Sequence, residues 1–167
     1  MNLKQMEYFV AAAEQLNFTR AAKKCFISQT AMTLQIQSLE EKIGVPLFVR
    51  DKHHVELTAA GKVYLNEARA ILVRAEEAAN RAAAVETADK LRNCTVKITA
   101  KGGANGKLFG AITGKEISEA LMAQFGLDVG KQKIVLDEPI KAFGSYEIRA
   151  KLGYEVSGKF TVTVAEE

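Results

Sequence analysis

The stretch between Gly61 and Gly102 contains no glycine and no proline, and this absence constrains the fold more than any other feature. Residues 58–92 are rich in alanine, glutamate and arginine, which favour helices, and Thr58 is a suitable N-cap. A helix of about 35 residues would be roughly 52 Å long, longer than a small domain, so it must protrude or pair. Its apolar residues recur at helical spacing: Tyr64, Ala68, Ile71, Leu72, Ala75, Ala79, Ala82 and Val85.

This helix separates two different sequence patterns. Before it, the apolar spacing is helical apart from one short hairpin. After it, four segments alternate and are rich in β-branched residues, which is typical of strands: "CTVKITA", "KQKIVL", "SYEIRAKLG" and "KFTVTVAE". Among them, "TGKEISEALMAQFG" predicts a short helix with Thr113 and Glu116 as a capping box and Gly126 as its end.

Charge and cysteine usage identify no particular partner. The net charge is +3, from 23 basic and 20 acidic residues, a balance that many proteins without a nucleic-acid partner share. Cys25 and Cys94 match no zinc or redox spacing, which fits a reducing cytoplasm. No segment approaches the roughly 18 apolar residues of a membrane span. The N-terminus is predicted to be an amphipathic helix and not a signal peptide.

The sequence shows no arrangement of residues typical of an enzyme. No Ser–His–Asp, Cys–His or paired-carboxylate pattern emerges, so the chain is predicted to be no enzyme and to hold no cofactor. The adjacent His53 and His54 would point apart on a strand or turn, which disfavours a metal site. "GGANGKLFG" lacks the P-loop order of glycine, lysine and Ser/Thr, so a mobile loop with a capped turn is predicted there.

The first part of the chain has a helix-turn-helix pattern. A first helix is predicted from about Leu3 to Leu16, Thr19 opens a short second helix, and a third runs from its cap Ser28 to Gly44. "VPLFVRDKHHVELT" then predicts two short strands and a turn, which form a wing. No charged residue lies between Ser28 and Leu39. The buried face of the third helix is expected to comprise Ala31, Met32, Leu34 or Gln35, Ile36, Leu39 and Ile43.

The order "F.AAAE..NFTRAA......SQ.A....I..LE...G..LF.R......LT.AG" resembles the winged helix-turn-helix region of LysR-type transcriptional regulators, from residue 1 to about 85. The resemblance implies that the third helix enters the major groove. Glutamine and threonine can read bases there, while most of the affinity comes from phosphate contacts elsewhere. An uncharged helix can therefore carry sequence information. The implied DNA-binding residues are Thr19, Arg20, Ser28, Gln29, Thr30, Thr33, Leu34, Gln37, Arg50, Lys52, His53 and His54.

Two residues depart from the pattern of that family. Thr30 stands where a proline is usual, and Leu34 stands where a basic residue is usual. Because Leu34 cannot make a charge-assisted contact, we expect weaker or altered DNA binding. The alternative is a DNA-binding site that has lost its function. For Gln35 and Gln37, the alternative to a contact with DNA is that their side chains are merely solvated on the helix surface.

The resemblance extends into the linker helix, which pairs two subunits in that family. A homodimer is therefore implied, with antiparallel helices, and its two-fold symmetry implies a pseudo-palindromic DNA site. The residues expected to pair the helices are Tyr64, Ala68, Ile71, Leu72 and Ala75.

The last part of the chain resembles another family. "KGGANGKLFGAITGKEI", "KIVLDEPIKAFGSYEI" and the final "GKFTVTV" are similar to the C-terminal domain of the bacterial large-subunit ribosomal protein L9, over residues 94–167 and the preceding "ETADKLRN". The resemblance implies a small α+β unit. The RNA-binding N-terminal domain of that family has no counterpart here. A weak contact with ribosomal RNA through Lys101, Lys107 and Lys115 remains an alternative.

The chain is therefore interpreted as a chimera of α+β class. Its predicted parts are an all-α winged helix-turn-helix over residues 1–58, a long linker helix over 59–92 and a small α+β domain over 93–167. We expect sequence-specific binding of double-stranded DNA by a cytoplasmic homodimer that lacks the effector domain of LysR-type regulators. An engineered fusion is favoured over a natural one, since no glycine or proline breaks the joining helix. The alternatives are a scaffold without regulatory role, and association with the ribosome or its RNA.

Overall fold

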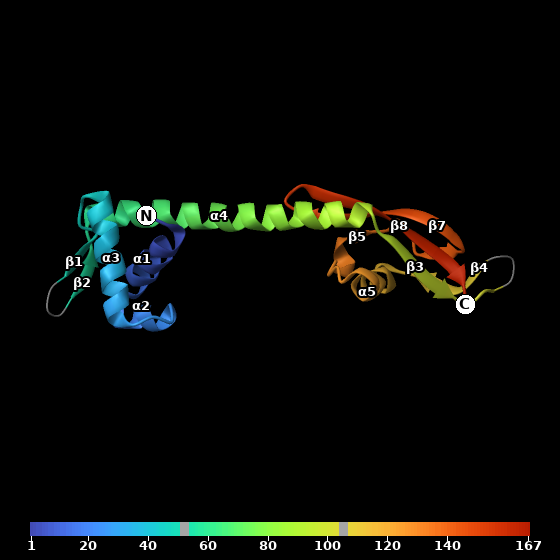
Figure 1. The fold of residues 1–167 in the computed structure, drawn as a ribbon, viewed down its shortest axis with the longest axis horizontal. Helices are drawn as coiled ribbons and strands as arrows, with labels where there is room; N and C mark the ends of the chain where they lie inside the picture. The colour runs from blue at the N-terminus through green and yellow to red at the C-terminus, as the bar shows by residue number, and fades with distance from the viewer. Residues whose placement is uncertain (51–53, 104–106) are drawn as a thin grey trace. The chain divides into compact units, whose positions relative to one another are not determined.

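The computed structural model describes residues 1–50, 54–103 and 107–167 (Figure 1). Its contacts divide the chain into two compact units, Met1–Glu76 and Glu77–Glu167, which we describe separately. Helix α4 (Ala59–Arg92) supplies residues to both units. The predicted α+β class is confirmed, with a winged helix-turn-helix in the first unit and a sheet domain in the second. None of the helices in the described residues is both long and apolar enough to cross a membrane.

Three capped helices open the first unit. Asn2 caps α1 (Leu3–Gln15), Asn17 caps α2 (Phe18–Lys24), and Ser28 caps α3 (Gln29–Ile43), each with its side-chain oxygen. The prediction that Thr19 opens the second helix was wrong, because the Asn17 carboxamide already accepts the free Arg20 N–H at 2.9 Å. Gly44 ends α3 as predicted, with a φ of 83° that favours glycine.

The wing joins α3 to α4 through a close backbone approach. Strands β1 (Phe48–Arg50) and β2 (Val55–Leu57) pair antiparallel, with Phe48 opposite Leu57. The predicted N-cap Thr58 accepts the N–H of Gly61 at 2.9 Å and donates to the Pro46 carbonyl at 2.8 Å. A Cβ at Gly61 would lie 2.1 Å from the Leu47 carbonyl oxygen. Only glycine therefore allows the first turn of α4 to pack this closely on the wing.

Aromatic rings form the centre of the first core. Phe9, fully buried on α1, lies 5.3 Å from the ring of Phe48 and 4.9 Å from that of Tyr64, measured between centroids. The rings of Phe18 and Phe48 are also 5.3 Å apart. Phe48 thus fastens the wing to α1 and α2, while Tyr64 fastens α4. This packing fixes the wing and α4 relative to α1 and α2.

The second unit is built on a four-stranded sheet with the order β3-β8-β7-β5. Strand β3 (Thr95–Ala100) runs parallel to β8 (Val156–Glu166), which pairs antiparallel with β7 (Gly144–Gly153). The short β5 (Ile134–Val135) completes it. A separate pair joins β4 (Lys107–Ile112) and β6 (Ile140–Ala142). Figure 1 shows α5 (Gly114–Phe125) beside the sheet.

The two predicted ends of α5 are confirmed. Thr113 and Glu116 form the capping box, and Gly126 ends the helix with a φ of 66°. Two other predictions for this unit were wrong in part. "KQKIVL" begins with a 3-10 turn, η2 (Lys131–Lys133), and only Ile134 and Val135 form the predicted strand. "GGANGKLFG" was predicted as a mobile loop; its residues 104–106 lie outside the described residues, but residues 107–110 begin β4, whose apolar Leu108 is buried.

The last turns of α4 belong to the core of the second unit. Ala84, Ala88 and Leu91 are buried there with residues of the sheet and α5. A Cβ at Gly158 would come within 3.2 Å of the Cα of Ala88 and 3.0 Å of a Leu91 methyl. The small residues on both sides let the helix backbone approach β8 closely.

Candidate nucleic-acid interface

Helix α3 has one buried face and one exposed stripe. Met32, Ile36 and Leu39 are fully buried in the core of the first unit. The predicted alternative of Leu34 or Gln35 as the buried residue is decided, because Leu34 is 59 % exposed while Gln35 is half-buried. The opposite stripe follows the helical spacing i, i+3, i+4 and i+7; it consists of the exposed Thr30, Leu34 and Gln37 and the half-buried Thr33. We call these four residues the α3 stripe.

Polar groups hold the beginning of α3 in place. The Ser28 hydroxyl accepts the Ala31 N–H at 3.1 Å, so this hydroxyl serves the helix cap. Thr19, on α2, donates its hydroxyl to the Oε1 of Gln29 at 2.8 Å. Both Gln29 and Thr30 are exposed. Thr19 therefore restrains the Gln29 amide beside the α3 stripe, which the sequence pattern did not reveal.

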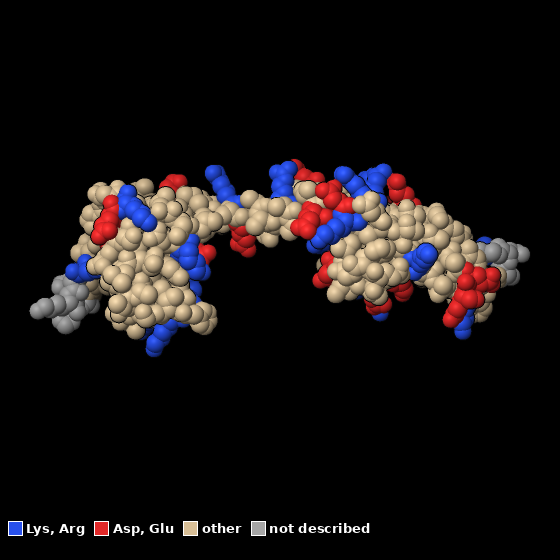
Figure 2. Space-filling view, viewed as in Figure 1, with Lys and Arg blue, Asp and Glu red and all other residues tan. Residues whose placement is uncertain are grey.

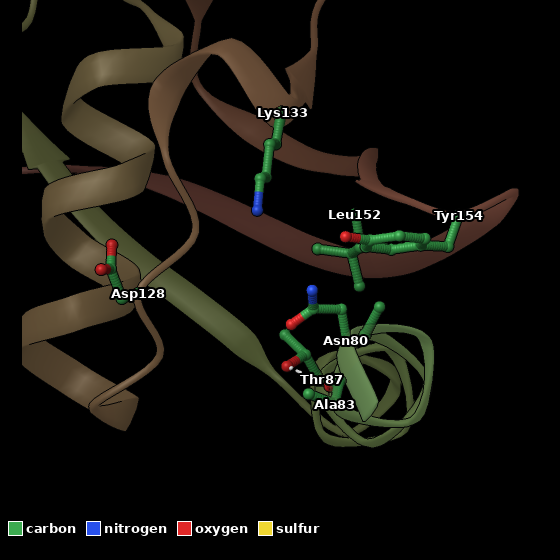
Figure 3. A pocket seen from close by; sticks show the side chains of 8 residues that line it. Asn80, Ala83, Thr87, Asp128, Lys133, Leu152 and Tyr154 are labelled. Atoms are coloured by element: carbon green, nitrogen blue, oxygen red, sulfur yellow. Dashed lines mark hydrogen bonds between the residues drawn. The ribbon is translucent and has the colours of Figure 1, made fainter. Parts of the chain in front are cut away.

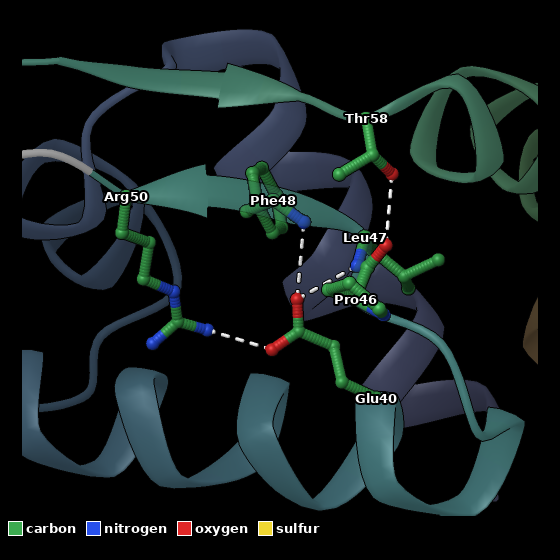
Figure 4. Close-up of polar contacts among 6 residues, drawn as sticks. All are labelled: Glu40, Pro46, Leu47, Phe48, Arg50 and Thr58. Atoms are coloured by element: carbon green, nitrogen blue, oxygen red, sulfur yellow. Dashed lines mark hydrogen bonds and ion pairs between the residues drawn. The ribbon is translucent and has the colours of Figure 1, made fainter.

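One carboxylate connects α3 to the wing (Figure 4). The Glu40 Oε1 accepts the backbone N–H groups of Leu47 at 2.8 Å and Phe48 at 3.0 Å. Its Oε2 pairs with the Arg50 guanidinium at 2.9 Å. That guanidinium also lies over the Phe18 ring, 4.8 Å from its centroid. The predicted phosphate-binding Arg50 is thus held at the base of the wing by α3 and α2.

The remaining predicted contact residues lie around this framework. Arg20 and His54 are exposed, on α2 and just before β2. Lys52 and His53 lie outside the described residues. Figure 2 shows lysine and arginine side chains interspersed with aspartate and glutamate on the visible face of the first unit. On this face, an anionic partner would therefore be held by individual cations.

The residues predicted to pair two α4 helices differ in how far the structure exposes them. Ala68 is fully buried in the core of its own unit, so its side chain is not available to a partner. Tyr64 is half-buried against Phe9, and burial raises the pKa of its phenol. Leu72 packs on the same core, Ala75 is half-buried, and Ile71 is 40 % exposed.

In the second unit, two of the three predicted lysines lie on paired segments. Lys101 follows β3 and Lys107 begins β4, and the Phe109 N–H donates to the Lys101 carbonyl at 2.9 Å. Both lysines are exposed, and the Phe109 ring, which sequence reasoning missed, is 86 % exposed. Lys115 lies separately on α5, where it pairs with Glu119 at 3.8 Å.

A cavity of about 330 Å³ opens between α4 and the turn that follows β7 (Figure 3). Lys133 and Asp128 lie at its rim, and Tyr154 and Leu152 form one wall. The Thr87 hydroxyl donates to the Ala83 carbonyl of its own helix, so it is already satisfied. No histidine or cysteine lines this cavity. Within the residues that the structure describes, no group of three or more His, Cys, Asp or Glu could hold a metal ion.

Two family models match the chain, one in each part. The model for bacterial regulatory helix-turn-helix proteins of the lysR family matches residues 3–62. The model for the ribosomal protein L9 C-terminal domain matches residues 82–166, which is half of the chain.

Curated relatives divide in the same way. The Hca operon transcriptional activator HcaR of Escherichia coli is 51 % identical over 90 residues, covering 54 % of this chain and 30 % of HcaR. The large ribosomal subunit protein bL9 of Oceanobacillus iheyensis is 52 % identical over 84 residues, covering 50 % of this chain and 57 % of bL9. That of Carboxydothermus hydrogenoformans is 45 % identical over 102 residues, covering 58 % and 68 %. The chain thus spans less than two thirds of the first two relatives.

Solved structures similar to the chain include protein–DNA complexes. A CbnR_DBD–DNA complex is 42 % identical with a TM-score of 0.50, covering 52 % of this chain and 99 % of that one. The BenM_DBD/benA site 1 DNA complex is 32 % identical, also with a TM-score of 0.50, covering 52 % and 97 %. These proteins share the winged helix-turn-helix and the start of the long helix.

Proposed function

We infer that this chain, which belongs to the ribosomal protein L9 C-terminal domain family over residues 82–166 and to the lysR family over residues 3–62, is a fusion that binds duplex DNA. Binding would use the first unit, as the head of a LysR-type regulator. The observation that carries this proposal is the uncharged α3 stripe, in which Thr30, Leu34 and Gln37 are exposed on a capped helix that the wing supports. Similar folds are bound to DNA in the CbnR_DBD and BenM_DBD complexes.

In this proposal, different residues recognise the bases and bind the phosphates. The α3 stripe and Gln29 would face base edges in the major groove, because amide and hydroxyl groups match donors and acceptors there. Arg20, Arg50 and His54 would contact phosphates from α2 and the wing, whereas Thr19, whose hydroxyl donates to Gln29, would position that residue. The Ser28 hydroxyl already caps α3. Its role would therefore be to orient the first backbone N–H groups of this helix toward the DNA.

We propose that α4 pairs two copies of the chain. Ile71 is apolar and 40 % exposed, and Ala75 follows it one turn later on the same face of the helix. Tyr64 and Leu72 would contribute the parts of their side chains that the core leaves open. A two-fold dimer would present two α3 helices, and it would prefer an inverted repeat.

The second unit has a different role in this proposal. The unit, which matches the ribosomal protein L9 C-terminal domain, would act as a solubilising or spacing module. It would give the chain no ligand switch and no enzymatic activity. Since regulators and ribosomal proteins both work beside nucleic acids, we place the fusion in the cytoplasm.

The test is selection from a random duplex DNA pool, followed by titration of the retained duplexes against salt. An enriched inverted repeat whose affinity falls steeply with rising salt is expected. Gln37→Ala should lose enrichment at one position of each half-site, whereas the control Gln132→Ala, exposed in the second unit, should leave the selected sequence unchanged. Salt-sensitive binding without any enrichment would contradict sequence-specific reading.

A second candidate function is favoured by Phe109. Its exposed ring lies on the same strand as Lys107, and its backbone pairs with Lys101. Such a ring is suited to stack on an unpaired base while the cations hold phosphates. Competition between ribosomal RNA and the selected duplex would test it. A preference for the RNA that Phe109→Ala abolishes would support ribosome association. If duplex DNA binds the unsubstituted chain no better than a Gln29/Arg50 double-alanine variant, and ribosomal RNA does not bind, the fusion is a scaffold without a regulatory role.

A further inference from the structure

The α3 stripe contains one apolar side chain that the core of the unit does not use. Leu34 is 59 % exposed, whereas the core on the opposite face of α3 is complete without it. A single exposed leucine is common on protein surfaces, so exposure alone assigns no role. Its location on the second turn of α3, one turn beyond Thr30, places it among the residues proposed to face the DNA.

The chemistry of the major groove restricts what Leu34 can contact. Base edges there present hydrogen-bond donors and acceptors, and the thymine 5-methyl is the one apolar group. Leucine opposite a donor or acceptor would remove its water without replacing the hydrogen bond, which weakens binding. Leucine opposite a methyl buries apolar surface on both partners. Neighbouring Thr30 and Thr33 add methyl groups and no charge.

We propose that Leu34 is a specificity-determining residue that recognises the 5-methyl group of a thymine in each half-site. The inference rests on the proposed function, since it needs α3 in the major groove. It predicts that the selected DNA contains a thymine whose exchange for cytosine is disfavoured mainly through loss of the methyl group. Because the leucine side chain is uncharged, the preference for thymine should persist as the salt concentration rises.

The experiment uses the selected duplex with each thymine replaced in turn by deoxyuridine, which differs only by the missing methyl. Equilibrium titration with the full chain should show about a fourfold loss of affinity at one thymine per half-site, as expected for one buried methyl. Leu34→Ala should bind the thymine and uridine duplexes equally at that position. Val73→Ala, which truncates an exposed apolar side chain on α4 outside the proposed interfaces, is the matched control, and it should keep the uridine effect there.

A third variant tests the direction of the change. Leu34→Arg should move the preference at the same position from thymine to guanine, because arginine pairs with the two guanine acceptors. An enriched site that is insensitive to every uridine, or a uridine effect that survives Leu34→Ala, would overturn this inference and leave DNA reading intact. A pool without enrichment would overturn DNA reading, and this inference with it.

Discussion

The hydroxyl of Thr19 on α2 donates a hydrogen bond to the Oε1 of Gln29, the first residue of α3, at 2.8 Å. This bond leaves the Gln29 amide nitrogen free to donate, and it removes rotational freedom before any partner arrives. A side chain already ordered in its binding conformation loses less entropy on binding. Thr19, which was predicted as a helix start and phosphate contact, therefore positions a base-reading residue.

Thr19→Val keeps the shape of the side chain and removes this hydrogen bond. We expect about a fivefold loss of affinity for the selected duplex, in line with a net hydrogen-bond contribution of about 1 kcal/mol. Binding to unrelated duplex DNA should change less, since phosphate contacts remain. Fluorescence anisotropy on both duplexes measures the ratio, with Thr99→Val, exposed on β3, as the control. An equal loss on both duplexes would contradict a positioning role.

Glu40 should be needed for the stability of the wing. Glu40→Ala leaves the Leu47 and Phe48 N–H groups without their acceptor and Arg50 without its partner. We expect a loss of about 2–3 kcal/mol in the free energy of unfolding of the first unit. Glu40→Gln, which keeps an acceptor oxygen, should lose less. Denaturant unfolding followed by the first-unit tyrosines would measure both, against the exposed Glu41→Ala; equal losses in both Glu40 variants would contradict the backbone role.

Gly61→Ala should prevent α4 from docking on the wing. A Cβ there would lie 2.1 Å from the Leu47 carbonyl oxygen, which is backbone and cannot swing away. We expect destabilisation of the first unit by more than about 2 kcal/mol. Amide hydrogen exchange should show faster exchange in residues 48–50 and 55–57 while β7 and β8 are unaffected. Asn66→Ala, exposed on the same helix, is the control.

The acid stability of the first unit should depend on Glu14. Lys24 and Arg69, at 3.0 and 3.1 Å, hold the pKa of this carboxyl below its ordinary value by hydrogen bonding. A lowered pKa in the folded state means that its stabilisation is present above the unfolded pKa and is lost as the pH falls through the folded one. Because Glu14 is about one third exposed, the effect should be below about 1 kcal/mol.

Glu14→Gln tests this directly. At pH 7 the first unit of the variant should unfold at a lower denaturant concentration than that of the unsubstituted chain. The difference should shrink as the pH falls below about 4.5 and vanish under more acidic conditions. Glu67→Gln serves as the control, since the described residues offer it no ion-pair partner. A difference that stays constant with pH would count against the ion pairs.

Ile71→Asp should weaken self-association. Ile71 lies on the face of α4 proposed to meet a partner, and a carboxylate there would lose its water on pairing. Sedimentation equilibrium should show a higher monomer fraction for this variant at micromolar concentration. Val73→Asp is the matched control, because Val73 is also exposed, at 55 %, and lies on another side of the helix. A chain that is monomeric without substitution would refute the dimer.

Local patterns in the sequence predicted most of the elements. Ser28, Gly44, Thr58, Thr113 and Gly126 end or cap helices where they were expected, because cap chemistry depends on a few neighbouring residues. Asn17 was missed since Thr19, two residues later, is an equally good cap type. Residues 107–110 were missed because the glycine-rich sequence around them resembles a loop, whereas their pairing with Lys101 and residues 140–142 depends on distant segments.

The candidate site was only partly predictable. The periodicity of α3 left Leu34 or Gln35 as the buried residue, and only the packing against α1 and α2 exposes Leu34. Likewise, the apolar stripe of α4 did not distinguish a partner helix from the chain's own core, which takes Ala68. The Glu40–Arg50 and Thr19–Gln29 pairs connect residues ten positions apart that lie on different elements. Such pairs follow from tertiary structure, which spacing alone does not contain.

The pairing of β3 with β8 has a consequence for synthesis on the ribosome. β3 follows α4 directly, yet its neighbour in the sheet is the last strand of the sequence, with Thr95 opposite Thr161 and Ala100 opposite Glu166. The first unit can fold as soon as Glu76 has emerged, since its residues end there. The second must wait, with β3 unpaired, until β8 has left the exit tunnel. The first unit of the nascent chain would therefore be folded before the sheet of the second unit can form.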